Sequence, residues 1–238
     1  MNVFKPNKEC FLSFLQKRLE TVDVDISDIK DILDESLNTT FKQLCLVNTK
    51  YNRDENNNNV IITVANNAQM CILYYNLYRN AYLKSIDINT LNNKKKEYKL
   101  IADKIYYLNI IDTSLNVLYT VKLPLKTHFD HPQGTIIGNA TFSDNSSLQI
   151  HQQCTIGGSI PLHILSGSIK SPYPNIDGNL IMYAKSTLLG NTQIKGTVVL
   201  SFGTQVMNAG LIENKLVFGM SPNLIFKDLK KDYVLFDK

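Results

Sequence analysis

Residues 176–206 read IDGNLIMYAKSTLLGNTQIKGTVVLSFGTQV, and an aliphatic side chain occupies every sixth position of this stretch. The positions of the series are Ile176, Met182, Leu188, Ile194, Leu200 and Val206. A period of six fits neither the 3.6-residue period of an α-helix nor the two-residue period of a simple strand. It is typical of a hexapeptide β-helix, in which aliphatic residues of successive turns stack on one another inside the coil. The alternative is an ordinary meander of buried strands, which would not hold six aliphatic residues in one register.

Small residues stand where the chain of such a solenoid must turn a corner. Gly138 and Gly157 each come directly after an isoleucine, and glycine permits the backbone angles that a sharp corner needs. The β-like pattern runs from about residue 119 to residue 226. The tail 227–238 then alternates charged and apolar residues. Because the last coil of a solenoid presents an unpaired edge, we expect this tail to cap it as a short helix or strand.

The N-terminal half instead carries apolar residues at helical spacing. The stretches that share this spacing are 11–19, 29–44, 68–83 and 98–118. A polar run around 89–96 is predicted to be a loop between the last two of them. The sequence therefore predicts an α+β chain with a helical domain at 1–118, a parallel β-helix of hexapeptide repeats at 119–226 and a capping tail at 227–238.

Composition sets broad limits on the class of protein. The 238 residues, 44% of them hydrophobic, suffice for one large or two modest domains. No uncharged apolar stretch reaches about 18 residues, so no membrane span is expected. The N-terminal residues carry charges and no small-residue cleavage site, which argues against a secretory signal. Lys94–Lys96 lie in a polar run and are interpreted as solvated surface rather than a nucleic-acid site, in keeping with the mild net charge of +4.

The cysteines indicate a reducing compartment. Cys10, Cys45, Cys71 and Cys154 are too widely spaced for a CxxC pair or a metal constellation. Reduced thiols are the usual state in the cytoplasm. We therefore expect a cytoplasmic protein without a bound metal.

Five short motifs of the second half occur in an order and spacing that resemble one enzyme family. They are DHPQGTIIG at 130–138, CTIGG at 154–158, PNI at 174–176, LLGN at 188–191 and FGMSP at 218–222. In the same order they are similar to the Asp-His-Ala-Thr-Gly-x-x-x-Gly, Val-Thr-Leu-Gly-Gly, Pro-Lys-Ile, Ile-Leu-Gly-Asn and Gly-x-Pro-Ala segments of the bacterial serine acetyltransferases. That family also places helices before a left-handed β-helix. The resemblance covers roughly residues 123–226.

The resemblance implies an acetyl-CoA-dependent acetyltransferase whose general base is His131. A neutral imidazole near pH 7 is suited to take the proton of an attacking hydroxyl or amine. Asp130 is the second candidate catalytic residue. It could orient the His131 ring, contact the acceptor or point elsewhere, because adjacent side chains of an extended chain face opposite ways. His128 and His151 are interpreted as structural.

The resemblance also implies where acetyl-CoA binds and how the chain assembles. Gly157, Gly158, Ala184 and Gly203 would line a groove for the narrow pantetheine arm, although the glycines could instead serve the corners alone. Enzymes of this class build each active site between two neighbouring solenoids. We therefore expect a homotrimer, with the helical domains able to join two trimers.

The acceptor side departs from the family pattern. Pro172-Tyr173-Pro174 stands where the family has Arg-His-Pro, so a second imidazole and a cation are missing. A desolvated amino-acid carboxylate needs such a charge partner. The segment 159–171 is longer than its family equivalent and contains His163, which with Tyr173 is a candidate for binding the acceptor.

These departures predict O- or N-acetylation of a carbohydrate, a nucleotide-sugar or a surface polysaccharide. Two alternatives remain open. One is serine O-acetylation in cysteine biosynthesis, as in the family that the motifs resemble. The other is a catalytically silent solenoid that serves as a scaffold, which the loss of the second histidine suggests.

Overall fold

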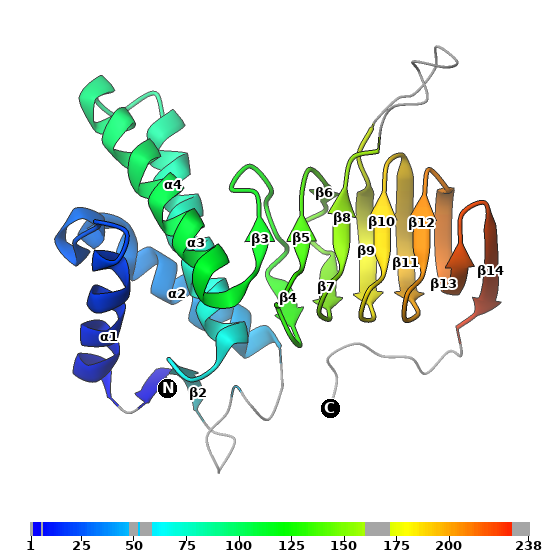
Figure 1. Cartoon of the computed structure of the whole chain (residues 1–238), viewed down its shortest axis with the longest axis horizontal. Helices are drawn as coiled ribbons and strands as arrows, with labels where there is room; N and C mark the ends of the chain where they lie inside the picture. Colours follow the sequence, from blue (N-terminus) through cyan, green and yellow to red (C-terminus); the bar gives the residue numbers. More distant parts are fainter. Residues whose placement is uncertain (1, 6, 48–51, 53–58, 160–171, 230–238) are drawn as a thin grey trace. The chain divides into compact units, whose positions relative to one another are not determined.

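The computed structural model describes residues 2–5, 7–47, 52, 59–159 and 172–229. The chain divides into two compact units between Leu115 and Asn116, and Figure 1 draws the elements of both. The first unit is mainly helical, and the second consists of strands.

The helical unit has four α-helices, one 3₁₀ turn and a pair of short parallel strands among its described residues. In chain order they are β1 (Asn2–Lys5), α1 (Lys8–Glu20), η1 (Ile26–Ile29), α2 (Lys30–Leu46), β2 (Val60–Thr63), α3 (Asn67–Ile86) and α4 (Asn92–Thr113). Helix α3 lies at the centre, and its residues 69–78 are all buried. A polar junction ties three helices together, because Asp112 of α4 accepts hydrogen bonds from Arg18 of α1 and Tyr74 of α3, both at 2.9 Å.

Two sequence predictions for this unit are wrong in detail. Helix α4 begins at Asn92, so most of the loop predicted at 89–96 is helix. The lysines of this run favour a helix, and ion pairs such as Lys94–Glu97 at 3.0 Å support its first turns. The helix ends at Thr113 rather than 118, because Ser114 adopts φ +56° and turns the chain. The pairing of β1 with β2 was not predicted, since four-residue strands leave no clear period.

The second unit is a β-helix. Its strands are β3 (Asn116–Val117), β4 (Lys126–Phe129), β5 (Ile136–Ile137), β6 (Thr141–Phe142), β7 (Ser147–Ile150), β8 (Thr155–Gly157), β9 (Asn175–Met182), β10 (Thr187–Leu189), β11 (Thr192–Leu200), β12 (Gln205–Met207), β13 (Gly210–Met220) and β14 (Asn223–Asp228). All pair in parallel except β14, which is antiparallel to β13. Figure 1 shows successive strands side by side along one axis.

The parallel strands form three faces. The first face holds β4, β7 and the C-terminal parts of β9, β11 and β13. The second holds β3, β5, β8, β10 and β12. The third holds β6 and the N-terminal parts of β9, β11 and β13. The chain visits the faces in this order, except that no strand of the described residues lies on the third face between β3 and β4.

The aliphatic series that decides the fold fills the interior. Ile176, Met182, Leu188, Ile194, Leu200 and Val206 are all fully buried. On the second face, Leu188 pairs in register with Ile156 on one side and with Val206 on the other. The prediction of a left-handed β-helix with these side chains pointing inward is confirmed.

Strand β14 lies at the C-terminal edge of the β-helix. It pairs with β13 from Met220 to Lys215, and Lys215 forms an ion pair with Asp228. The cap was predicted after residue 226, whereas β14 begins at Asn223. Residues 230–238 of the predicted tail lie outside the described residues.

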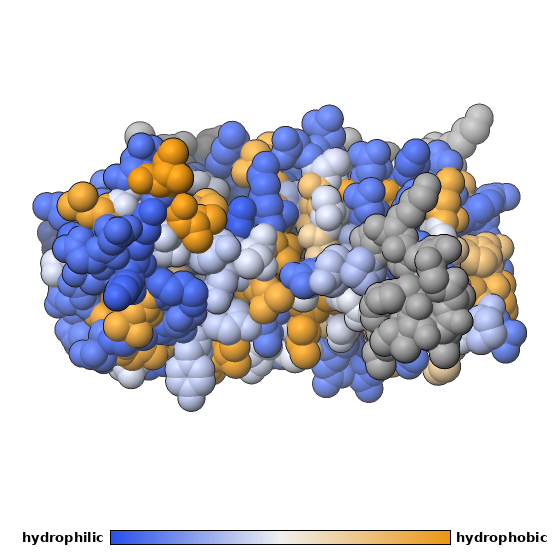
Figure 2. Space-filling view, turned by 90° about the horizontal axis from the view of Figure 1, so that it is seen from above, coloured by the Kyte–Doolittle hydropathy of each residue, from blue (hydrophilic) through white to orange (hydrophobic). Residues whose placement is uncertain are grey.

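The visible surface offers no continuous apolar belt. In Figure 2 polar residues predominate and apolar residues gather in separate patches. Among the helices that the structure describes, none combines the length and the apolar character that crossing a membrane requires.

Candidate active site

The candidate residues lie along two different corners of the β-helix. The corner between the first and second faces, here called the histidine corner, consists of residues 130–134, 151–153, 183–185 and 201–203. Backbone hydrogen bonds stack its layers: His151 N donates to Met182 O at 2.9 Å, and Tyr183 N donates to Leu200 O at 3.0 Å. The corner between the second and third faces, here called the glycine corner, consists of residues 138–139, 157–159, 190–191 and 208–209. Gly190 N donates to Gly157 O there at 2.9 Å.

Asp130 is the centre of a polar cluster on the histidine corner. Its Oδ1 accepts a hydrogen bond from Nε2 of His128 at 3.0 Å, and its Oδ2 accepts one from Nε2 of Gln149 at 2.8 Å. Nε2 of His151 lies 3.1 Å from the same Oδ2. The cluster therefore joins two successive coils through one carboxylate.

The cluster keeps Asp130 ionised. Burial alone would raise the pKa of this carboxyl, but the hydrogen bonds from His128 and Gln149 and the charges of His128 and His151 outweigh burial and lower the pKa to about 2. An ionised carboxylate only accepts hydrogen bonds. The hydrogen bond from His128 therefore comes from an N–H at its Nε2.

His151 is held in place from two sides. Its ring stacks on Tyr183 with the ring centroids 4.9 Å apart and the planes 19° apart. Burial lowers the pKa of His151 and the nearby Asp130 opposes this, while the positive charges of His131 and His128 lower it further. About a quarter of the side chain is exposed. This arrangement favours a neutral, oriented and accessible imidazole.

His131 differs from His151 in its surroundings. It directly follows Asp130 and is exposed, while the Asp130 carboxylate is held by the cluster. In the described part of the chain, no other side chain hydrogen-bonds to the His131 ring. Asp130 was expected to orient the His131 ring, contact the acceptor or point elsewhere. In this structure its carboxylate bonds to His128 and Gln149 rather than to the His131 ring.

Ala184 and Gly203 share the histidine corner. Gly203 N donates to Ala184 O at 3.0 Å, and Gly203 adopts φ +68°. A Cβ added at Gly203 would meet no atom within 4 Å, so the backbone is open to a ligand there. Nζ of Lys185 lies 5.7 Å from the centroid of the Phe202 ring, which is 67% exposed.

Gly157, Gly158 and Tyr173 lie instead on or beside the glycine corner. Gly157 is buried and pairs with Leu189 of β10. A Cβ added at Gly158 would lie 3.0 Å from Cε1 of Tyr173, so the tyrosine ring occupies the space above this glycine. Within one chain, these three residues therefore lie at a different corner from His131, Ala184 and Gly203. His163, the other predicted acceptor-binding residue, lies outside the described residues.

Sequence reasoning missed the cluster around Asp130, although a signal was present. His128 and Asp130 are two residues apart on an extended segment, as are Gln149 and His151, so each pair faces one side. The register pairs His128 with Gln149. Polar residues in alternation on two strands that occupy the same face would have predicted the cluster.

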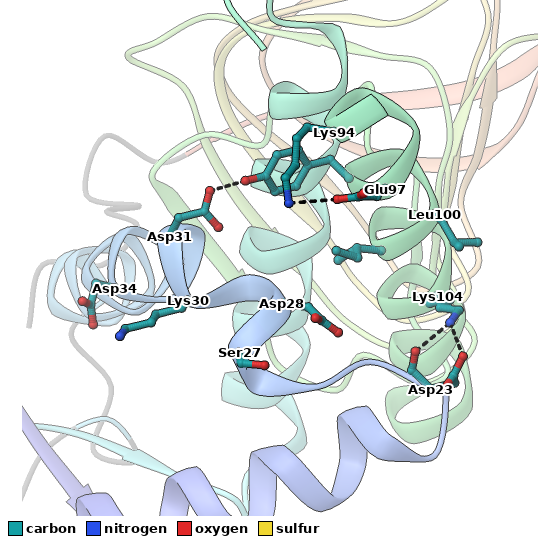
Figure 3. Close-up of a pocket in the computed structure, with 12 residues that line it drawn as sticks. Asp23, Ser27, Asp28, Lys30, Asp31, Asp34, Lys94, Glu97, Leu100 and Lys104 are labelled. Carbon is teal, nitrogen blue, oxygen red and sulfur yellow. Dashed lines mark hydrogen bonds and ion pairs between the residues drawn. The ribbon is translucent and has the colours of Figure 1, made fainter. Parts of the chain in front are cut away.

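The helical unit contains a groove of about 850 Å³ between η1, α2 and α4, shown in Figure 3. Two ion pairs lie along it: Lys104 with Asp23 at 2.7 Å, and Lys94 with Glu97 at 3.0 Å. Asp31 accepts a hydrogen bond from Tyr98 across it. The described residues hold no group of three or more His, Cys, Asp or Glu side chains arranged for a metal ion.

Comparisons with known proteins identify the fold. No protein-family model matches the sequence, and no curated protein matches it significantly. The serine acetyltransferase of Brucella abortus strain S19 superposes with a TM-score of 0.62 at 17% identity, over 90% of this chain and 81% of that chain. The same enzyme in complex with coenzyme A gives a TM-score of 0.60 at 16% identity, over 90% and 80%. The serine acetyltransferase of Vibrio cholerae O1 biovar El Tor N16961 gives 0.60 at 13% identity, over 89% and 76%. At these identities the similarity is one of architecture, and the chain has the fold of the serine acetyltransferases.

Proposed function

We propose that this protein is an acetyl-CoA-dependent acetyltransferase. The observation that carries the proposal is the pair of accessible imidazoles, His131 and His151, on the corner of a β-helix whose fold is that of enzymes solved with coenzyme A. Acetyl transfer from a thioester needs a base for the acceptor's proton, and an imidazole serves near pH 7. His131 is the base predicted from the sequence.

The histidine corner also has room for the donor. The open backbone at Gly203 and the small side chain of Ala184 suit a narrow pantetheine arm that hydrogen-bonds to main-chain groups. Coenzyme A supplies the activated acetyl group as a thioester, and the chain's own residues bind that arm and manage the proton. Gly157 and Gly158 lie at the glycine corner, so they could line the groove at the histidine corner only if a neighbouring chain supplied them.

L-serine is the acceptor that the comparisons favour, since the similar structures are serine acetyltransferases, one of them in complex with cysteine. A carbohydrate hydroxyl, on a sugar, a nucleotide-sugar or a surface polysaccharide, is the second candidate. Tyr173 favours it, because this residue is 39% exposed beside Gly158 and an aromatic face with a hydroxyl suits a sugar ring.

The proposal includes a homotrimer of β-helices in the cytoplasm. The domain that carries the chemistry is 119–226, and the helical domain 1–118 joins trimers into a larger assembly. Closed cyclic symmetry would bring the histidine corner of one chain near the glycine corner of another.

Two measurements on the purified protein test the activity against a scaffold role. Acetyl-CoA is expected to raise the melting temperature, because a ligand of the native state stabilises it. Release of free thiol is then followed with a panel that contains L-serine, sugars and nucleotide-sugars. Thiol release with one acceptor supports the enzyme and names its acceptor class. Absence of both the thermal shift and thiol release would favour the scaffold.

A further inference from the structure

The turn that joins α3 to α4 exposes several aliphatic side chains on a short segment. This segment, here called the hairpin tip, consists of residues 83–97, and Figure 1 draws it where the two helices meet. Its exposed aliphatic residues are Leu83 at 41%, Ile86 at 55%, Ile88 at 89% and Leu91 at 70%. Single exposed apolar residues are ordinary on a protein surface, whereas a group of them in one place marks an interaction site.

Hydrogen bonds define the turn that carries these side chains. Asn89 N donates to Oδ1 of Asp87 at 3.0 Å, and Thr90 N donates to O of Asp87 at 3.2 Å. Such bonds from an aspartate to the residues that follow it are typical of a tight turn. The exposure of Ile88 and Leu91 therefore belongs to a defined turn rather than to an irregular loop.

The start of α4 gives up helix stability at the same place. The N-cap position, which favours Ser, Thr, Asp or Asn, is occupied by Leu91, and no side chain hydrogen-bonds to cap the helix there. The first turn has no acidic residue, and Lys94, Lys95 and Lys96 lie near the positive end of the helix dipole, where cations are unfavourable. A sequence is expected to break such local rules where a functional requirement outweighs them.

The hairpin tip is also positively charged. It holds four lysines together with Asp87 and Glu97, so its net charge is +2, half of the +4 of the whole chain. Lys94 pairs with Glu97 at 3.0 Å. Within the part of the chain that the structure describes, Lys95 and Lys96 form no ion pair. Cations beside exposed aliphatic side chains are thus available to a partner.

We propose that the hairpin tip binds the surface of a membrane that contains anionic lipids. Aliphatic side chains gain free energy when they leave water for the boundary between headgroups and acyl chains, and lysines beside them attract anionic headgroups. The tip thus presents the two features that such a surface recognises.

Two other partners fit the hairpin tip less well. A nucleic acid would use the lysines but leave the aliphatic residues in water, and residues 83–97 include no aromatic side chain on which a base could stack. A symmetric contact between the tips of two copies would place the same lysines opposite one another. Like charges in such a contact repel, whereas an anionic surface attracts them.

Co-sedimentation of the purified protein with lipid vesicles tests the proposal. We expect binding to vesicles of equal parts phosphatidylcholine and phosphatidylglycerol, much weaker binding to phosphatidylcholine alone, and weaker binding as salt is added. A variant with Ile88→Ser and Leu91→Ser should lower the partition coefficient by about tenfold or more. A variant with Lys94→Gln, Lys95→Gln and Lys96→Gln should lower it by roughly 10²-fold.

Stability separates loss of the lipid contact from damage to the fold. Serine is a favourable N-cap residue and leucine is not, so Leu91→Ser should keep or raise the melting temperature while it weakens vesicle binding. A residue with a structural role alone would show the opposite change in stability. Thiol release with acetyl-CoA should be unchanged in both tip variants.

Each tip variant has a matched control elsewhere in the chain. Leu211→Ser removes an aliphatic side chain of similar exposure, 56%, from the β-helix. A variant with Lys5→Gln, Lys8→Gln and Lys17→Gln removes three exposed lysines from the helical unit and changes the net charge equally. Both controls should bind vesicles nearly as the wild type does, because charges more than a Debye length from the membrane are screened.

The remaining outcomes would overturn the proposal. They are equal binding to both kinds of vesicle, binding to neither, and losses in the controls as large as those in the tip variants. A tip variant with altered mass in light scattering but unaltered vesicle binding would make the tip a contact between copies. Binding of a duplex DNA oligonucleotide without binding of vesicles would make the partner a nucleic acid. None of these results depends on acetyl transfer, so this inference and the proposed function can fail separately.

Discussion

Asp130→Asn removes the charge at the centre of the histidine corner, and its effect on stability can be worked from the structure. The carboxylate accepts hydrogen bonds from His128 and Gln149, and these with the nearby imidazoles lower its pKa from 3.8 to about 2. A shift of this size corresponds to about 2 kcal/mol of free energy of unfolding. About a quarter of the side chain is exposed, so solvent screens the interaction little.

The sign of the pH dependence follows from the direction of the shift. The folded-state pKa lies below the unfolded value, so the unfolded chain binds the proton first as the pH falls. The stabilisation is therefore complete above about pH 5 and is lost as the pH falls toward 2. Asp130→Asn should be less stable than wild type by about 2 kcal/mol at pH 5, and the difference should shrink steadily below pH 4.

Urea unfolding followed by circular dichroism at several pH values between 5 and 2.5 measures this difference. Asp144→Asn is the control, because the Asp144 side chain is 82% exposed and its partner Lys122 lies at the surface. A gap between wild type and Asp130→Asn that stays constant from pH 5 to 2.5 would refute the ionised cluster.

Further predictions concern activity, packing and assembly. His131→Ala should lower kcat by roughly 10²–10⁴-fold and leave the acetyl-CoA thermal shift nearly unchanged; full activity would reject a role for this ring. Leu188→Ala should cost about 2–5 kcal/mol in urea unfolding, because the side chain is fully buried, whereas Leu211→Ala, 56% exposed, should cost far less. Tyr173→Phe should raise KM for the acceptor more than KM for acetyl-CoA if the phenolic hydroxyl binds the acceptor; equal effects on both would contradict that role. Light scattering at micromolar concentration should report a trimer, and a monomer would contradict the shared site.

The repeating part of the fold could be predicted from the sequence because one physical requirement recurs at each coil. Leu188 must be apolar since Ile156 and Val206 lie directly above and below it. The same logic fails where no repeat exists. The start of α4 at Asn92 depends on ion pairs along the helix, and the pairing of β1 with β2 joins segments more than fifty residues apart.

The site was harder to predict than the fold, because neighbours in the sequence are not neighbours in the site. Asp130 and His131 are adjacent, yet Asp130 bonds to His128 and to residues of the next coil. The histidines classed as structural, His128 and His151, are the ones that meet the carboxylate. Only the register between β4 and β7 reveals this. A motif within one segment does not show which residues of the next coil lie beside it.

The two corners also bear on the quaternary structure. Ala184 and Gly190 mark the histidine and glycine corners of one coil, and the six-residue step between them spans up to roughly 20 Å at about 3.3 Å per residue. His131 and Tyr173 stand at opposite ends of such a span, so one chain cannot present both to the same small acceptor. Either the acceptor meets only the histidine corner, or a second chain supplies Tyr173 and Gly158. If the acceptor meets only the histidine corner, the Tyr173→Ala chain alone would already be active. If a second chain supplies Tyr173, a mixture of inactive His131→Ala and Tyr173→Ala chains would regain activity at the mixed interfaces.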